Sequence, residues 1–261
     1  DGHRAMVIAD QNGLVDRAAA HRGGLGWWGR NANLLLPGHG SWFVLGAVVT
    51  DADLGPGDAV VADGCRSCTR CVSGCPTGAI VDDGVIDARR CLAWIVQQRG
   101  MMPRAYRVAL GDRIYGCDDC QDVCPPGRGD VRSADDVGND TDAPQAWVSV
   151  ADILAASDDE LLETYGRWYI ADREARYLRR NALVVLGNVG DGGHGDRSLV
   201  ARAIVDGDPL VRAHAVWTAA RLGFDDLVSA CEDDPHPWVR SEVALAATVP
   251  RRRPVTLGVA P

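Results

Sequence analysis

The first sixty residues combine short apolar runs with glycine-rich breaks. Residues 14–20 have the apolar spacing of a helix, whereas 33–37 and 41–50 are apolar runs that indicate strands or buried extended segments. Residues 24–29 have the Gly-x-Gly-x-x-Gly spacing of a dinucleotide-binding loop. Because a helix leads into this loop and no clear helix follows it, the pattern argues against a nucleotide site.

Helical patterns dominate the later part of the chain. Residues 87–98 predict one helix, and Ser157 with Glu160 predicts a capping box at the start of another. A Pro-led pattern with an early Val-Arg pair occurs at Arg212 and again 28 residues later at Arg240. This period predicts stacked helix pairs of the HEAT type, which present an extended face to a large partner. The alternative is a helical cap that only stabilises the core.

Composition excludes several classes of protein. The chain has 261 residues, of which 46% are hydrophobic and 24% are charged, so disorder is excluded as its main state. Apolar runs fall far short of the roughly 18 residues of a membrane helix, and the N-terminus has no signal-peptide pattern. We therefore expect a cytoplasmic protein without a membrane span. The net charge of −9 argues against a surface that binds nucleic acid all over, although it allows a local basic patch.

Eight of the nine cysteines lie between residues 65 and 124. The first group is the bacterial ferredoxin pattern Cys-x2-Cys-x2-Cys-x3-Cys-Pro, and the second repeats the end of that pattern after one displaced cysteine. In two-cluster ferredoxins the fourth cysteine of a run binds the other cluster. This rule predicts two 4Fe–4S sites, one from Cys65, Cys68, Cys71 and Cys124, and one from Cys75, Cys91, Cys117 and Cys120.

Zinc is the alternative metal for a four-cysteine site. It usually takes paired Cys-x2-Cys knuckles, whereas this chain has a three-cysteine run closed by Cys-x3-Cys-Pro, which favours iron–sulfur clusters. The ninth cysteine, Cys231, is alone in the helical region and is predicted to be a small buried apolar residue.

Several further stretches form a combination that is more specific than the cysteine motifs alone. They are 10–17, 24–31, 40–46, 112–120 and 178–182. Together with both cysteine groups, they make the chain resemble the epoxyqueuosine reductase family. Members of that family are cobalamin-dependent iron–sulfur enzymes that act on tRNA.

The resemblance implies an α+β fold with separate functional parts. These parts are a partial cobalamin-binding α/β domain over 1–60, a ferredoxin-like double-cluster domain over 61–126, a linker over 127–150, HEAT-like helical repeats over 151–250 and a tail over 251–261. Family members carry further residues ahead of the position of Asp1, so the resemblance also implies an N-terminally truncated cobalamin-binding domain.

The resemblance further implies an oxidoreductase that converts epoxyqueuosine at the tRNA wobble position to queuosine. Electrons from an external donor would pass through the two clusters to cobalamin. Asp10, in an Asp-x6-Arg pattern with Arg17, matches the family's proton donor. A carboxylic acid has an ordinary pKa of about 4, so a site of low dielectric would have to raise the pKa of Asp10 for this role. A helix N-cap is the structural alternative for Asp10.

Two leucines match positions at which family members contact cobalamin. They are Leu34 and Leu45, and ordinary core packing is the alternative role for both. Arginines of the helical region are candidates for contacts with tRNA phosphates, and a solvated or ion-paired helix face is the alternative. They are Arg176, Arg179, Arg180, Arg212 and Arg240.

Two other functions fit the same motifs. One is a corrinoid reductase of a different substrate, and the other is a non-enzymatic electron-transfer protein with two clusters and a helical docking surface. The helical repeats favour a macromolecular substrate and hence the tRNA enzyme.

Overall fold

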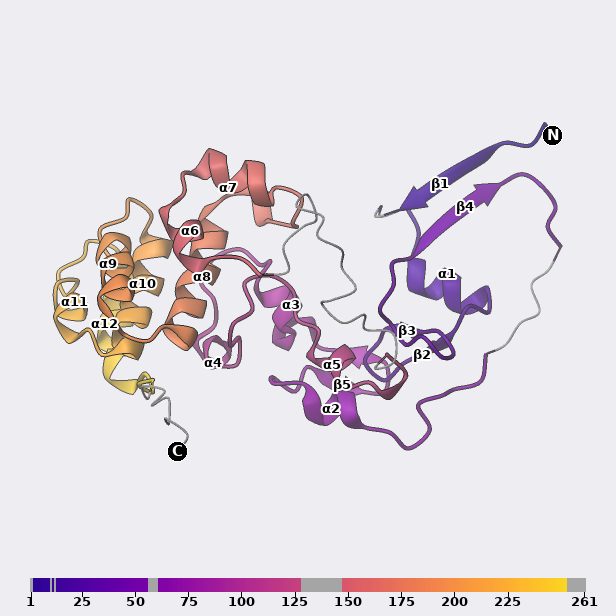
Figure 1. Cartoon of the computed structure of the whole chain (residues 1–261), viewed down its shortest axis with the longest axis horizontal. Helices are drawn as coiled ribbons and strands as arrows, with labels where there is room; N and C mark the ends of the chain where they lie inside the picture. Colours follow the sequence, from indigo (N-terminus) through magenta and orange to yellow (C-terminus); the bar gives the residue numbers. More distant parts are fainter. Residues whose placement is uncertain (1, 10, 12, 56–60, 128–146, 253–261) are drawn as a thin grey trace, which may run out of the picture. The chain divides into compact units, whose positions relative to one another are not determined.

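The computed structural model describes residues 2–9, 11, 13–55, 61–127 and 147–252, which form two compact units (Figure 1). The N-terminal unit contains Asp1–Cys91 and Asp118–Asp142, and the helical unit contains Leu92–Cys117 and Ala143–Pro261. The sequence analysis placed residues 61–126 in one domain. In the structure, the inner part of this range, Leu92–Cys117, packs within the helical unit.

Short strands and helices make up the N-terminal unit. They are β1 (Ala5–Ala9), α1 (Asp16–Arg22), β2 (Trp27–Trp28), β3 (Leu34–Leu35), β4 (Gly46–Thr50), α2 (Arg70–Gly74), β5 (Ile80–Asp82), β6 (Val85–Ile86), the 3-10 helix η1 (Ala88–Arg90), α5 (Asp119–Asp122) and the 3-10 helix η2 (Pro125–Gly127). Three antiparallel pairs connect the strands: β1 with β4, β2 with β3, and β5 with β6. The predicted extended segment 41–50 forms a strand only over its second half, and the predicted helix begins two residues late, at Asp16.

Helices stack along the helical unit (Figure 1). They are α3 (Leu92–Ile95), α4 (Arg104–Arg107), α6 (Val150–Ala155), α7 (Asp158–Tyr165), the 3-10 helix η4 (Ala171–Arg173), α8 (Arg176–Val189), α9 (His194–Ala203), α10 (Pro209–Leu222), α11 (Asp225–Ser229), α12 (Pro237–Ala244) and the 3-10 helix η5 (Ala246–Thr248). Helix α10 packs against α8 and α12, and its buried residues form the centre of the core. Within the described residues, no helix has both the length and the apolarity to cross a membrane.

Local capping explains where several helices begin. The predicted capping box is confirmed, since the Ser157 hydroxyl accepts a hydrogen bond from the Glu160 amide and the Glu160 carboxylate accepts one from the Ser157 amide. The two Pro-led helices begin alike. Asp208 caps α10 by accepting from the Leu210 amide at 2.7 Å, and His236 caps α12 in the same way.

The continuous helix predicted for residues 87–98 is wrong. Asp87 caps the single turn of η1 by accepting a hydrogen bond from the Arg89 amide at 3.1 Å. Cys91 then adopts an extended conformation, with φ −74° and ψ 122°, which ends η1 before α3 begins at Leu92. Apolar periodicity alone could not separate the two short helices from one longer helix.

A buried arginine ties Leu92–Cys117 to α8. The Arg180 side chain is completely buried, and its guanidinium donates to the carbonyl oxygens of Val96 at 2.9 Å, Gln98 at 2.6 Å and Gly100 at 2.7 Å. Asn181 adds hydrogen bonds to the carbonyls of Val96 and Ile114. The predicted role of Arg180 in binding tRNA phosphate is therefore wrong, because its donors are used inside the core and solvent cannot reach them.

The other candidate arginines differ in accessibility. Arg212 forms a two-pronged ion pair with Asp234, and its side chain is only 14% exposed. Arg179 pairs with Asp158 and is similarly covered. Arg240 is exposed.

The prediction that Cys231 is buried is confirmed.

His214, in the middle of α10, predicts a pH dependence of stability. Its Nδ1 donates to the Leu210 carbonyl at 2.8 Å and its Nε2 accepts from the Met102 amide at 3.2 Å, so this network requires the neutral imidazole. Burial, reinforced by the nearby Arg107, lowers the pKa of His214 well below its ordinary value of 6.5. Below pH 6.5 the unfolded chain therefore binds a proton that the folded chain does not.

We expect this group to lower the free energy of unfolding as the pH falls below 6.5, by up to about 1.4 kcal/mol per pH unit. The measurement is denaturant unfolding at several pH values between 7.5 and 5, on the native chain and on His214→Gln, which keeps an acceptor but does not titrate. The two curves should diverge towards low pH. Parallel curves would contradict a neutral, buried imidazole.

Candidate cluster and cofactor sites

Four cysteines of the N-terminal unit line one cavity of about 380 Å³. They are Cys65, Cys68, Cys71 and Cys124, the set that the sequence assigned to the first cluster, and Trp27, Asn31 and Leu35 line the same cavity. Four cysteines around one cavity match the number of thiolate ligands that a 4Fe–4S cluster takes.

Close backbone packing brings the two cysteine groups of this cavity together. Helix α2 carries Cys71 and packs against α5, which ends just before Cys124. Gly74, at the end of α2, allows this approach, because a Cβ atom there would lie 2.9 Å from the Val123 side chain. The backbone amides of Cys68 and Cys124 each donate to the carbonyl three residues earlier, which places both cysteines in tight turns.

Burial and neighbouring thiols disfavour the ionisation of two cysteines of this cavity. Burial and the neighbouring thiols Cys65, Cys71 and Cys68 raise the pKa of Cys124 to about 11. The pKa of Cys71 is also raised, first by burial and then by Cys65. Four thiolates in such a site need a compensating positive charge, and iron ions supply it when a cluster binds.

Cys75, one cysteine of the second predicted set, lies in a different environment. Cys75 accepts a hydrogen bond from the Ala79 amide at 3.2 Å, and Thr77 lies beside its sulfur. Burial acts to raise the pKa of Cys75, but these hydrogen bonds outweigh it and the pKa lies below its ordinary value. Cys75, Cys91 and Cys120 belong to the N-terminal unit, whereas Cys117 is the last residue of Leu92–Cys117 in the helical unit.

The hairpin of β2 and β3 forms one wall of the cluster cavity. In this hairpin Trp27 pairs with Leu35, and Trp28 pairs with Leu34. Side chains alternate between the two faces of a strand, and accordingly Leu35 lines the cluster cavity while Leu34 lines a second, larger cleft. Gly26 allows the tight hairpin, since a Cβ atom there would lie 2.2 Å from the Leu35 carbonyl oxygen.

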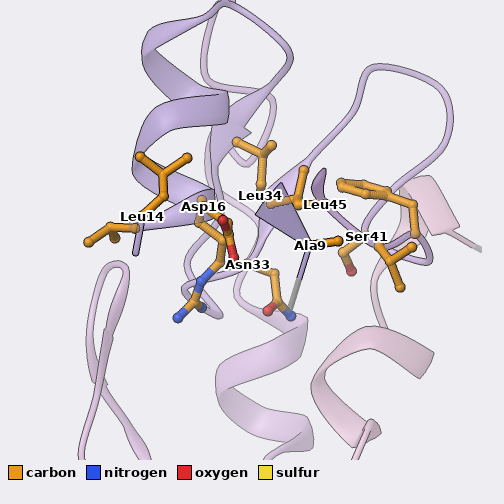
Figure 2. A pocket seen from close by; sticks show the side chains of 11 residues that line it. Ala9, Leu14, Asp16, Asn33, Leu34, Ser41 and Leu45 are labelled. Carbon is orange, nitrogen blue, oxygen red and sulfur yellow. The ribbon is translucent and has the colours of Figure 1, made fainter. Parts of the chain in front are cut away.

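The cleft on the other side of β3 has a volume of about 920 Å³. Figure 2 shows the side chains of Leu34, Leu45, Asp16 and Asn33 at this cleft, so the two leucines predicted to contact cobalamin lie in one place. Phe43 and Val44 extend its apolar wall. The volume lies near the upper end of the range for small-molecule sites, and an apolar wall with a few polar groups is typical of cofactor sites.

Asp10, the predicted proton donor, lies outside the described residues. Its neighbour Ala9, at the end of β1, lines the cleft, and so does Arg17, the other end of the Asp-x6-Arg pattern. The Arg17 guanidinium donates to the Ala32 carbonyl and lies 5.7 Å from the centre of the Trp28 ring.

Comparisons with known proteins agree on one family. Residues 64–127 match the family of the 4Fe–4S double cluster binding domain. The epoxyqueuosine reductase of Bacillus anthracis is 33% identical over 226 residues, which cover 86% of this chain and 58% of the relative. The enzyme of Staphylococcus aureus is 34% identical over 239 residues, with coverages of 90% and 62%.

Comparison with solved structures points to the same family. An epoxyqueuosine reductase crystallised with a tRNA-Tyr epoxyqueuosine-modified tRNA stem loop is 28% identical, with a TM-score of 0.82 over 95% of this chain and 67% of that chain. This chain belongs to the epoxyqueuosine reductase family. It spans about three fifths of the length of the curated relatives named above. Another structure of the family, from Bacillus subtilis, has an aspartate catalytic loop swung out of the active site, and it is 26% identical with a TM-score of 0.79.

Residues 24–31, one of the stretches that carry the family resemblance, have a clear structural role in this chain. They supply the hairpin with Trp27 and Trp28, and they supply Asn31, whose side chain donates to the Cys120 carbonyl at 3.3 Å and accepts from the Asn33 amide at 3.2 Å. Asn31 thus connects a cysteine of the second set to the cleft. The sequence analysis quoted this segment but did not assign Trp27 to a site. In the sequence, the high content of glycine and tryptophan in residues 24–31 was the signal that could have indicated a site there.

Replacing one cysteine ligand should remove one cluster and leave the other. We expect Cys124→Ser to reduce the iron content from about eight to about four per chain, because one of the two 4Fe–4S clusters loses a thiolate ligand. Cys231→Ser is the matched control and should keep all the iron, since Cys231 donates to the Leu227 carbonyl within the helical unit. Iron and acid-labile sulfide are measured after anaerobic reconstitution. Full iron in Cys124→Ser would remove Cys124 from the ligand set.

Proposed function

We propose that this chain forms the cluster-binding and cofactor-binding part of a cobalamin-dependent iron–sulfur reductase that converts epoxyqueuosine in tRNA to queuosine. The observation that carries the proposal is the position of β3. Leu34 faces a cleft large enough for a cofactor, and the next residue, Leu35, faces the cavity of four cysteines. In this proposal, a single strand would separate the two redox groups.

The eight clustered cysteines supply the ligands in this proposal. One cluster takes Cys65, Cys68, Cys71 and Cys124, and the other takes Cys75, Cys91, Cys117 and Cys120. The cavity that these four cysteines line together supports the first set. When bound, the clusters supply single electrons from an external donor, and cobalamin supplies a strongly reducing cobalt centre for removal of the epoxide oxygen.

The residues of the cleft suit a corrin. Leu34 and Leu45 offer apolar contact for the flat macrocycle, and Asn33 and Ser41 offer polar groups for its peripheral amides. Asp10 is proposed to donate the proton that the departing oxygen requires. A general acid that works at neutral pH needs a pKa above the ordinary range of a carboxyl group.

A solved relative bound to a tRNA stem loop supports tRNA as the substrate. On this chain the exposed Arg240, near the start of α12, is the best remaining candidate for a phosphate contact, followed by the partly exposed Arg176. The net charge of −9 makes such contacts local rather than general.

Anaerobic reconstitution with iron, sulfide and cobalamin tests the proposal. We expect about eight irons per chain and a cobalt-sensitive visible spectrum that persists after desalting. A reduced sample should then remove one oxygen atom from epoxyqueuosine in a tRNA stem loop, as measured by mass spectrometry. Eight irons without cobalamin would overturn the proposal in favour of a two-cluster electron-transfer protein. Cobalamin retention without reaction on tRNA would favour a corrinoid reductase of another substrate.

A charge placed in the cleft gives a sharper test of the cofactor site. We expect Leu45→Glu to retain at least tenfold less cobalamin at an unchanged iron content, because the carboxylate would be desolvated against the macrocycle. The matched control is Val48→Glu on β4, since Val48 is 64% exposed and is not among the residues that line the cleft. Equal retention by both variants would place the cofactor elsewhere.

A further inference from the structure

Trp27 is held in one position against the cluster cavity. Its side chain is only 6% exposed, and its backbone pairs with Leu35 in the β2–β3 hairpin. Gly64, next to Cys65, packs directly on the indole ring, because a Cβ atom at Gly64 would lie 2.7 Å from the ring carbon Cζ2. The ring is therefore enclosed by the hairpin on one side and by the start of the cysteine run on the other.

This position directs the indole nitrogen at a cysteine sulfur. Trp27 Nε1 donates a hydrogen bond to Cys65 Sγ, with a nitrogen-to-sulfur distance of 3.3 Å. Tryptophan has a single donor, and a buried indole N–H usually has a partner. The neighbouring Trp28 differs, since its indole nitrogen donates to the Gly84 carbonyl at 3.4 Å.

Hydrogen bonds to the sulfur atoms of an iron–sulfur site change its reduction potential. A donor stabilises the extra negative charge of the reduced form more than it stabilises the oxidised form, and so it raises the potential. The effect is strongest in a buried site, where water does not compete with the donor.

We propose that Trp27 is a positioning residue that raises the reduction potential of the cluster held by Cys65, through the hydrogen bond from its indole to that sulfur. The inference rests on the ligand set assigned under the proposed function. Because Leu35 pairs with Trp27 and the adjacent Leu34 lines the cleft, the tuned cluster is the one beside the cofactor cleft. A higher potential there favours the arrival of electrons next to the cleft.

The test is a redox titration of the reconstituted full chain followed by electron paramagnetic resonance. In Trp27→Phe we expect one of the two cluster potentials to become more negative, with the other unchanged and with the iron content preserved. Trp28→Phe is the matched control and should change neither potential. In the Cys124→Ser background, which leaves the second cluster, adding Trp27→Phe should also change nothing.

A second measurement tests the inference even if the Trp27→Phe variant loses iron. Electron–nuclear double resonance of the native, reduced protein should detect a strongly coupled proton on the first cluster that exchanges in D2O and is absent in Trp27→Phe. Unchanged potentials in an iron-replete Trp27→Phe would overturn the inference, and so would the absence of such a proton in the native protein. If the native chain binds no clusters at all, the ligand assignment fails instead, and the iron content alone reveals that outcome.

Discussion

Replacing Arg180 by Met is expected to destabilise the helical unit by about 3 kcal/mol or more. The guanidinium satisfies the carbonyls of Val96, Gln98 and Gly100 inside the core, at distances of 2.6 to 2.9 Å. Methionine fills similar volume but donates nothing, so several buried carbonyls lose their partners at roughly 1–3 kcal/mol each. Burial lowers the pKa of Arg180 to about 10, so the native side chain is still charged at neutral pH.

Denaturant unfolding, followed by the far-ultraviolet circular dichroism of the helices, measures this loss. The matched control is Arg197→Met on α9, whose ion pair with Asp226 is between two exposed side chains. An exposed pair contributes at most about 1 kcal/mol, so the control should unfold almost like the native protein. Equal effects of the two substitutions would mean that the carbonyls around Arg180 find other partners, such as water.

Arg180→Met should also affect iron binding. The carbonyls that Arg180 holds belong to Leu92–Cys117, and two predicted ligands of the second cluster, Cys91 and Cys117, flank or end this segment. We therefore expect partial loss of iron from the second site, at about four irons per chain when the loss is complete. The hydrogen bonds of Asn181 to Val96 and Ile114 give the same segment further support.

Arg180 also illustrates what the sequence could not predict. The sequence analysis made Arg180 a candidate for a phosphate contact, and arginine is mostly exposed in proteins. Its actual partners lie about 80 residues away along the chain, and no local pattern encodes that pairing. Burial of a charged side chain is a property of the tertiary fold.

Chemistry with a fixed spacing was easier to predict. The cysteine runs predicted a shared site for Cys65, Cys68, Cys71 and Cys124, because the ferredoxin pattern encodes both the turn and the crossing, and these four cysteines line one cavity. The capping box of Ser157 and Glu160 is equally local, and it was predicted correctly. The result for Cys91 is mixed. Its spacing from the other cysteines indicated a ligand, but the sequence did not indicate the break between η1 and α3 at this residue.

Two consecutive leucines separate the cleft from the cluster cavity, since Leu34 lines the cleft and Leu35 lines the cavity. A strand of two residues is too short for a periodic signal, so Leu34 and Leu35 could be placed on opposite faces only once the hairpin with Trp27 and Trp28 was known. Tight glycine packing at Gly26, rather than phosphate binding, explains the glycines of that segment.

Asp10→Asn is expected to lower the single-turnover rate of epoxide removal by about 100-fold or more, because asparagine has the shape of the acid but cannot supply its proton. Iron content and the visible spectrum of bound cobalamin should not change. The reaction is measured with chemically reduced, reconstituted protein and a tRNA stem loop carrying epoxyqueuosine, so that electron delivery from an external donor does not limit the rate.

Asp16 provides the decisive comparison for Asp10. It lies in the first turn of α1, lines the same cleft and is partly buried, so it is a second carboxyl near the proposed cofactor (Figure 2). Asp16, however, is not the aspartate that matches the family's proton donor in the Asp-x6-Arg pattern. Asp16→Asn should therefore keep most of the single-turnover rate. A large loss in Asp16→Asn with full turnover in Asp10→Asn would transfer the acid role from the Asp-x6-Arg segment to α1.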